Sequence, residues 1–416
     1  MIRDPVSVAA RTGSPVARRH PVLALLGPAF VAAVAYVDPG NFATNISAGA
    51  QYGYLLCWVV LTANLAAMLV QYLSAKLGVA AGRDLPELCR AHLPRPASVG
   101  LWVQAELVAM ATDLAEFVGA AIGLNLLFGV TLPAAGLITA FVALAVLALE
   151  QRGLRRFELA IAALFGVVLL GFAYDLTAIG AEPAGIAAGL VPRFAGGPSV
   201  VLAVGIVGAT VMPHVVYLHS ALTAGQARDT SDIPTSRRLR SLRLDVVLAL
   251  GAASLVNLAM LAMAATLLHH AGHTGADPIL LAHTDLGRTI GGGAALVFAV
   301  ALLASGLSSS SVGTYAGQVV MRGFLGRSTP LFARRAITML PALAVLALRL
   351  PPTDSLVISQ VVLSFGIPFA LVPLIWLTRR TDVMGALANH PITTLTASGC
   401  ALLITAMNVA LIVAAL

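Results

Sequence analysis

Asp38, Pro39, Gly40 and Asn41 interrupt an apolar stretch that begins at Val22. Proline removes a backbone donor and clashes with the preceding turn, and glycine adds backbone freedom, so a helix is expected to unwind here. In a membrane span, an ionised Asp near the centre costs at least about 3 kcal/mol, and unwound backbone is tolerated only inside the protein or beside water. A carboxylate and an amide at such a point predict a cation-binding site.

A second interruption is Met212-Pro213-His214. With the two prolines aligned, residues 35–39 and 209–213 share alanine, valine and proline, and the methionine takes the position of the aspartate. Carboxylate and carbonyl oxygens suit Mg²⁺, Ca²⁺ and Mn²⁺, whereas thioether sulfur favours softer metals. A site with both donor types is predicted to accept Mn²⁺, Fe²⁺, Co²⁺, Zn²⁺ or Cd²⁺ and to discriminate against Ca²⁺ and Mg²⁺. Two unrelated proline kinks, with a methionine used only in packing, are the alternative.

The composition is that of a membrane protein, because 59% of the 416 residues are hydrophobic, 10% are charged and the mean hydropathy is +0.92. A span takes about 20 apolar residues. Eleven such segments are predicted, and short hairpins join them into one compact domain. They are residues 22–50, 52–79, 98–128, 132–149, 157–175, 199–226, 242–268, 289–322, 333–350, 355–378 and 392–414. The three cysteines are scattered and indicate neither a disulfide framework nor a thiolate metal site.

The two interruptions fall in the first and sixth predicted segments. Because they lie five spans apart and five is odd, the two halves of the chain are expected to be inverted relative to each other. Helices broken by Gly or Pro at corresponding positions of inverted halves are the best sequence pointer to a transport site at the membrane midplane.

Basic residues are distributed very unequally between the two sides of this arrangement. The side that holds the N-terminal tail and the connections after even-numbered segments carries 22 of the 25 lysines and arginines. The positive-inside rule therefore places the N-terminus in the cytoplasm and the C-terminus on the outer face of the plasma (inner) membrane. Arginines that face anionic lipid explain the net charge of +7, and no nucleic-acid partner is predicted.

The Asp-Pro-Gly-Asn and Met-Pro-His sequences resemble the two signature motifs of the Nramp family, the natural resistance-associated macrophage proteins, and in particular its bacterial manganese-transport members. The resemblance covers essentially the whole chain and includes residues 36–47, 104–117, 205–223, 304–318 and 359–373. It implies an all-α polytopic membrane protein of the LeuT type, with two inverted five-helix repeats plus one helix, and with helices 1 and 6 unwound at the midplane. The implied divisions are a cytoplasmic tail (1–21), the first repeat (22–175), the second repeat with its connecting loop (176–378) and the last helix (379–416).

The resemblance also implies proton-coupled import of Mn²⁺ and Fe²⁺ by alternating access. The metal is then the transported substrate and the proton the co-substrate, and no bound cofactor is expected. By position in the motifs, the metal ligands would be the side chains of Asp38, Asn41 and Met212 and the backbone carbonyls of Ala35 and Ala209, with Gln360 joining them in some states.

The third predicted segment carries three acidic residues, Glu106, Asp113 and Glu116. Separations of seven and three residues put them on one face of a helix. Acidic residues inside a bilayer usually face a partner or a proton path. Carboxylates hydrogen-bonded for helix packing are the alternative.

The resemblance extends a proton route from Asp38 through this acidic face to Arg334 and Arg335, at the start of the ninth segment. At least one of these arginines is expected to pair with an acid of the third segment, although both also fit as ordinary positive-inside anchors. His214, one residue past the second break, belongs to a residue type that titrates near physiological pH and is placed on the same route.

Three other functions fit the residues less well. A sodium-coupled amino-acid or other organic-solute symporter on the same fold would have little use for a carboxylate beside a methionine sulfur. A metalloenzyme would need His or carboxylate ligands with an open position and a base, and the predicted segments contain no HExxH-type cluster, so the chain is not expected to be an enzyme. Two half-helix breaks indicate a closed, alternating site rather than a passive channel. The expected partners are divalent metal ions, protons and the lipid bilayer, with no obligatory protein partner.

Histidines outside the two motifs have no firm role. His269, His270, His273 and His283 gather in the predicted external connection after the seventh segment. They would either collect metal ions at the entrance or belong to an exposed loop, and the lack of fixed ligand spacing favours the loop. His219, in the same segment as the second break, is only weakly indicated as functional.

Overall fold

The computed structural model describes residues 27–150, 154–180, 182–229, 233–269, 277–327 and 330–415. Within these ranges the regular secondary structure is helical throughout. The predicted tail, residues 1–21, and the start of the first predicted segment lie outside the described residues.

Each predicted segment overlaps a helix or a pair of helices. These are α2 (Pro28–Ala35) with α3 (Pro39–Tyr52), α4 (Cys57–Ala81), α6 (Arg95–Phe128), α7 (Leu132–Glu150), α8 (Leu154–Ile179), α10 (Gly197–Thr210) with α11 (Pro213–Asp229), α12 (Thr235–Leu267), α14 (Gly292–Leu325), α15 (Leu331–Thr338) with α16 (Leu340–Ala347), α17 (Pro352–Thr378) and α19 (Pro391–Ala415). The short connecting helices are η2 (Gly53–Leu56), α5 (Leu85–His92), α9 (Pro183–Gly189), α13 (Pro278–Thr289), α18 (Thr381–Met384) and η3 (Gly385–Leu387).

Seven helical stretches of the described residues are long and apolar enough to cross a membrane, or eight if the bent pair α8 and α9 counts as one span. The count of eleven therefore stays a prediction. One reason is the ninth predicted segment, which the structure divides at Met339 into α15 and α16, each of eight residues. Pro341 explains the division, because it has no N–H to donate to the carbonyl of Ile337 one turn earlier.

Both predicted breaks are present. Residues 36–38 separate α2 from α3, and Asp38 is the N-cap of α3, with its side chain accepting a hydrogen bond from the Asn41 backbone N–H. Val211 and Met212 separate α10 from α11, and Val211 leaves helical geometry at φ −102° and ψ 69°. The first and sixth predicted segments are therefore both broken helices.

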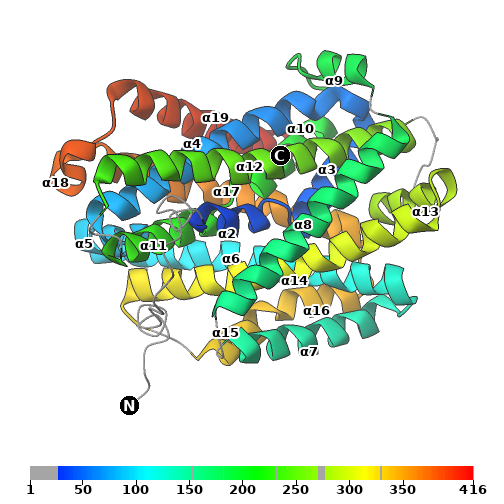
Figure 1. Cartoon of the computed structure of the whole chain (residues 1–416), viewed down its shortest axis with the longest axis horizontal. Helices are drawn as coiled ribbons and strands as arrows, with labels where there is room; N and C mark the ends of the chain where they lie inside the picture. Colours follow the sequence, from blue (N-terminus) through cyan, green and yellow to red (C-terminus); the bar gives the residue numbers. More distant parts are fainter. Residues whose placement is uncertain are drawn as a thin grey trace.

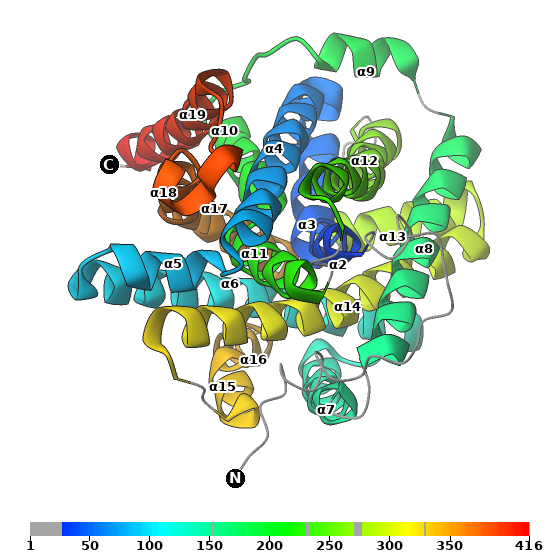
Figure 2. The ribbon, with the colours of Figure 1, turned by 60° about the vertical axis from the view of Figure 1, so that its left-hand side comes forward.

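The broken helices lie inside the bundle. Figure 2 shows α2 and α3 near its centre, with α4, α11, α12 and α14 around them. α12 packs along α3 and α4, α10 packs along α17, and α14 packs along α6. The connectors α5 and α18 lie at one end of the molecule and α9 and α13 at the other (Figure 1), as expected if the helices cross between the two ends.

Polar and apolar residues are arranged as in a membrane protein. Large apolar side chains on the outer helices are exposed, among them Phe141 at 76% and Leu395 at 75%, while Asp38, Asn41 and Gln360 are at most 1% exposed. Exposed apolar surface of this extent matches a lipid environment rather than water. The chain is a multi-pass membrane protein.

Candidate functional site

The centre of the site is the Asn41 side chain, which joins the two broken helices. Its Nδ2 donates to Asp38 Oδ1 at 2.8 Å and to the backbone carbonyl oxygen of Ala209 at 3.0 Å. The Asn41 backbone N–H also donates to Asp38 Oδ1 at 2.8 Å. A carboxylate, an amide and a backbone carbonyl from sequence positions about 170 residues apart thus meet at one point.

Two prolines explain why backbone carbonyls are available at this point. In a continuous helix the N–H of residue 39 would donate to the Ala35 carbonyl, and that of residue 213 to the Ala209 carbonyl. Pro39 and Pro213 have no N–H, so both carbonyls lose their helical donor. The two carbonyls predicted as metal ligands are therefore the ones that the prolines release.

Several oxygen atoms at the breaks are buried without a hydrogen-bond partner among the described residues. They are Asp38 Oδ2, Asn41 Oδ1 and Gln360 Oε1. An unpaired buried carboxylate or amide oxygen is costly, so a group of such atoms in a native structure favours a ligand that accepts their lone pairs. Together with the backbone carbonyl of Ala209, which lies beside Asn41, these oxygens form the kind of donor set that divalent metal ions prefer.

Glycines bring Gln360 to the breaks. A Cβ at Gly40 would lie 2.9 Å from Gln360 Cγ, and a Cβ at Gly208 would lie 2.9 Å from the backbone carbonyl carbon of Gln360. A side chain at Gly208 would push the α17 backbone away from the broken helices, and a side chain at Gly40 would displace the Gln360 side chain. The structure therefore places Gln360 against residues of both broken helices.

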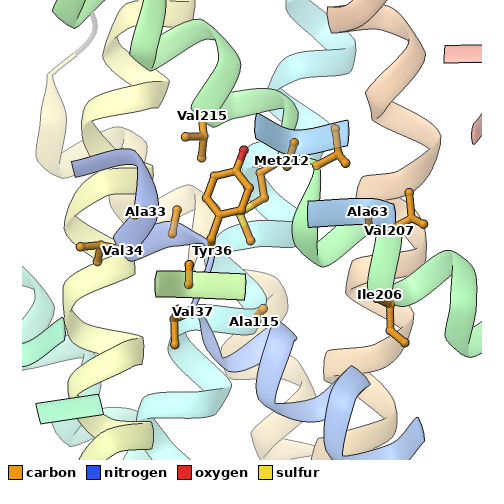
Figure 3. Packing of buried hydrophobic residues seen from close by; sticks show 14 of the residues in the cluster. Ala33, Val34, Tyr36, Val37, Ala63, Ala115, Ile206, Val207, Met212 and Val215 are labelled. Carbon is orange, nitrogen blue, oxygen red and sulfur yellow. The ribbon is translucent and has the colours of Figure 1, made fainter. Parts of the chain in front are cut away.

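Met212 and Ala35 lie at the breaks themselves, and each is at most 1% exposed. Figure 3 shows the Met212 side chain beside the ring of Tyr36, the first residue after α2. Among the described residues no hydrogen bond links either residue to the Asp38–Asn41–Ala209 group, so their ligand role stays a prediction from their positions in the chain.

The acidic face of α6 is paired with α15. Arg335 Nη1 lies 2.5 Å from Asp113 Oδ1, and its Nη2 donates to the Ser310 hydroxyl. Arg334 Nη2 lies 2.9 Å from Glu106 Oε2. The predicted pairing of an arginine with an acid of the third segment is thus confirmed, and it holds for both arginines.

Glu116 belongs to the acidic face of α6, and His214 is the second residue of α11, directly after the second break. The charges of Asp113, Arg335 and Asp38 are near enough to act on Glu116, whose Oε2 is buried without a partner among the described residues. The Nδ1 of His214 is 3.3 Å from the Thr112 hydroxyl of α6, and its Nε2 is likewise unpaired. The structure therefore brings all the predicted proton-route residues to α6 or to elements packed against it.

Sequence reasoning missed the polar side chains that hold the unwound backbone of the first break. Asn257 Nδ2 donates to the Tyr36 carbonyl at 3.1 Å, and Ser305 Oγ donates to the Val37 carbonyl at 2.5 Å. Gln71 Nε2 donates to the Tyr36 hydroxyl at 2.7 Å, and Gln71 Oε1 lies 2.8 Å from Nδ1 of His219. Asn257, Ser305 and Gln71 could have been noticed in the sequence, because each is a polar residue inside an apolar segment, and such residues usually have a function or a polar partner.

The external histidines do not form a site within the described residues. His269 Nδ1 lies 3.2 Å from the Ala50 carbonyl, the ring of His283 packs against Phe298, and His270 and His273 lie outside the described residues. No group of three or more His, Cys, Asp or Glu side chains in the described part of the chain is arranged to hold a metal ion.

Comparison with known proteins identifies the family. Residues 29–414 match the family described as natural resistance-associated macrophage protein-like, Nramp. The chain is 51% identical over 389 residues to the divalent metal cation transporter MntH of Deinococcus radiodurans, covering 93% of this chain and 89% of that protein. It is 48% identical over 393 residues to MntH of Bacillus subtilis, covering 94% and 92%.

Solved structures agree with these relatives. The Eremococcus coleocola manganese transporter superposes with a TM-score of 0.82 at 31% identity, covering 94% of this chain and 87% of that one. Mhp1, a nucleobase-cation-symport-1 family transporter, superposes with a TM-score of 0.63 at 13% identity, which shows likeness of fold alone. The chain belongs to the Nramp family, and the predicted LeuT-type fold class is confirmed.

Proposed function

We propose that this chain imports divalent transition metal ions, Mn²⁺ and Fe²⁺ foremost, through a midplane site between its two broken helices. The observation that carries the proposal is the position of the Asn41 side chain, which holds the Asp38 carboxylate and the Ala209 carbonyl at 2.8 and 3.0 Å. Beside them, Asp38 Oδ2, Asn41 Oδ1 and Gln360 Oε1 accept no hydrogen bond from the described residues. The relatives that match most of the chain are divalent metal cation transporters, which agrees with this site and with a transporter rather than an enzyme.

Selectivity is assigned to Met212. Its thioether sulfur strengthens binding of softer ions such as Mn²⁺, Fe²⁺, Co²⁺, Zn²⁺ and Cd²⁺, and contributes little to binding of Ca²⁺ or Mg²⁺. A sodium-coupled organic-solute symporter would gain nothing from sulfur at this point, so the soft atom favours metal transport.

Proton coupling is assigned to Asp38 and the acidic face of α6. On this proposal Asp38 loses its proton when metal binds, and His214, Glu116 and Asp113 pass proton charge towards the Arg334 and Arg335 end. Their burial and mutual proximity support the route. Inward movement of charge is favoured by about 2.3 kcal/mol per unit charge per 100 mV. Glu116→Gln in proteoliposomes is expected to reduce proton flux and its voltage dependence, and unchanged flux would exclude the route.

The remaining features follow from charge and chain topology. The protein lies in the plasma (inner) membrane with its N-terminus in the cytoplasm and needs no obligatory protein partner. Residues 22–175 and 176–378 form the inverted repeats, and alternating access exposes the site to each side in turn. The paired breaks in α2–α3 and α10–α11 support this division.

The proposal is tested by uptake of Mn²⁺, Cd²⁺ and Ca²⁺ into proteoliposomes. Wild type is expected to take up Mn²⁺ and Cd²⁺ and to exclude Ca²⁺, and Asp38→Asn is expected to abolish uptake. In Met212→Ala, Cd²⁺ uptake is expected to fall most and Ca²⁺ to compete better. Sodium-dependent uptake of an amino acid, without metal uptake, would overturn the proposal.

A further inference from the structure

Lys76 and Arg243 are two cations that no carboxylate of the described residues pairs with. Lys76 Nζ donates to Asn389 Oδ1 at 2.8 Å. Arg243 Nε donates to the Tyr72 hydroxyl at 3.1 Å, and its guanidinium lies 5.2 Å from the centre of the Tyr72 ring. Arg380, at the same end of the bundle, differs because its Nη2 lies 2.5 Å from an Asp382 carboxylate oxygen. Lys76 and Arg243 are therefore held by neutral groups, and no carboxylate of the described residues compensates their positive charge.

The two cations are held on the same side of α4. Tyr72 and Lys76 are four residues apart and share one helical face, so Arg243 of α12, which contacts Tyr72, is brought near Lys76, and their charges act on each other. Asn389 fixes Lys76, because Asn389 itself donates to the carbonyl and hydroxyl oxygens of Thr378 at 2.9 and 2.8 Å. Two like charges held close together favour an anion between or beside them.

Arg243 also stands where an outward-facing apolar strip of α12 begins. The next residues on the outer surface are Leu244, Val247 and Leu248, exposed by 46%, 56% and 49%. Apolar side chains that follow an arginine along an exposed helix face mark the level where lipid headgroups give way to acyl chains. Tyr72, with an apolar ring and a polar hydroxyl, is a residue type enriched at this level.

We propose that Lys76 and Arg243 bind the phosphate of an anionic phospholipid headgroup, with its acyl chains lying along Leu244, Val247 and Leu248 of α12. Basic side chains between transmembrane helices at the headgroup level are characteristic of such sites. The two cations supply the charge, the guanidinium supplies paired N–H donors for phosphate oxygens, and the apolar strip explains why a lipid suits the site better than free phosphate.

The test is native mass spectrometry of the full-length protein in detergent with phosphatidylglycerol or phosphatidylcholine added at equal concentration. Wild type is expected to retain phosphatidylglycerol in preference to phosphatidylcholine. Each of Lys76→Gln and Arg243→Gln is expected to weaken the retention about fivefold, the effect of removing one charge near an anionic lipid. Arg193→Gln removes an exposed arginine elsewhere and is expected to leave it unchanged.

Two further arms distinguish a bound lipid from free phosphate and from a purely structural role of Arg243. Inorganic phosphate is expected neither to displace phosphatidylglycerol nor to reproduce its effect on the thermal unfolding midpoint. Arg243→Lys keeps the charge and is expected to retain more lipid than Arg243→Gln. If the Arg243 guanidinium served only to pack on Tyr72, both variants would lose it and would retain lipid equally. Equal retention of the two lipids, full retention in both Gln variants, or an equal effect of inorganic phosphate would overturn the proposal.

Discussion

The side-chain amide of Asn41 on α3 lies 3.0 Å from the backbone carbonyl oxygen of Ala209 on α10, so the two broken helices meet through a hydrogen bond. The same amide nitrogen lies 2.8 Å from the Asp38 carboxylate. Asn41 therefore fixes the distance between an anionic oxygen of one broken helix and a carbonyl oxygen of the other.

Replacing this amide tests its positioning role. Asn41→Ala is expected to lower Mn²⁺ uptake about 10- to 100-fold, the usual cost of removing a group that orients metal ligands. Asn125→Ala is the matched control, because Asn125 donates to the Val130 carbonyl after the end of α6 and is expected to leave uptake unchanged. Equal uptake by Asn41→Ala and wild type would show that Asn41 neither orients nor ligates the metal.

Close packing of α17 on α10 depends on Gly208. A Cβ there would lie 2.9 Å from the Ser364 backbone nitrogen, so Gly208→Ala is expected to destabilise the protein by about 1–3 kcal/mol and to impair uptake. Gly251→Ala is the control, because its Cβ would have only Met68 Cε as a neighbour, at 4.0 Å. That change is expected to be neutral or to stabilise by about 0.5–1 kcal/mol. Thermal unfolding midpoints distinguish the two, and equal midpoints would contradict the packing argument.

The Arg335–Asp113 pair is nearly buried, with 4% and 8% of the side chains exposed. Removing either partner leaves a buried charge unpaired, so Arg335→Gln and Asp113→Asn are each expected to destabilise the protein by about 3–5 kcal/mol. The double variant is expected to lose much less than the sum of the two. Simple additivity in this cycle, measured by thermal or denaturant unfolding, would mean that the pair is not coupled.

Asp84, outside the spans, predicts a pH dependence of stability. It caps α5 by accepting from the Glu87 backbone N–H at 2.8 Å. Burial, with a smaller effect of the Glu87 charge, raises the pKa of Asp84 from 3.8 to about 7. Because the folded state then binds the proton more tightly than the unfolded state, this contribution is full below about pH 4 and is lost as the pH rises through about 7.

Asp84→Asn keeps a good N-cap but removes the titration. The unfolding midpoint of this variant is expected to fall less than that of wild type between pH 4 and pH 7. Asp382→Asn changes an acid whose side chain is 57% exposed and is expected to keep the wild-type slope. Identical slopes for wild type and Asp84→Asn would show that Asp84 does not titrate in this range.

The sequence predicted the breaks because proline and glycine act locally. Pro39 and Pro213 each begin a new helix and cannot donate to the preceding turn, so the released carbonyls follow from the chain itself. Proline alone does not stop a helix, because Pro368 and Pro373 lie inside α17. The sequence also predicted that an arginine of the ninth segment pairs with an acid of the third, because a buried acid needs a partner, but it did not predict which residues pair.

What the sequence did not predict depends on contacts between distant residues. Nothing in the neighbourhood of Ser305 shows that its hydroxyl reaches the Val37 carbonyl, which is 268 residues away. The same holds for Gln71, which links the Tyr36 hydroxyl to His219. Such hydrogen bonds depend on how the helices pack. A polar residue in an apolar segment indicates that it has a partner, but the sequence does not show which residue that partner is.

The most direct measurement of the central claim is X-ray absorption at the cadmium edge of Cd²⁺-loaded protein. Wild type is expected to show oxygen neighbours and one sulfur neighbour around the ion. The sulfur signal is expected to disappear in Met212→Ala and to persist in Met260→Ala, which removes another fully buried methionine. An ion surrounded only by oxygen and nitrogen in wild type, or a sulfur signal that survives Met212→Ala, would contradict a metal site shared between the two broken helices.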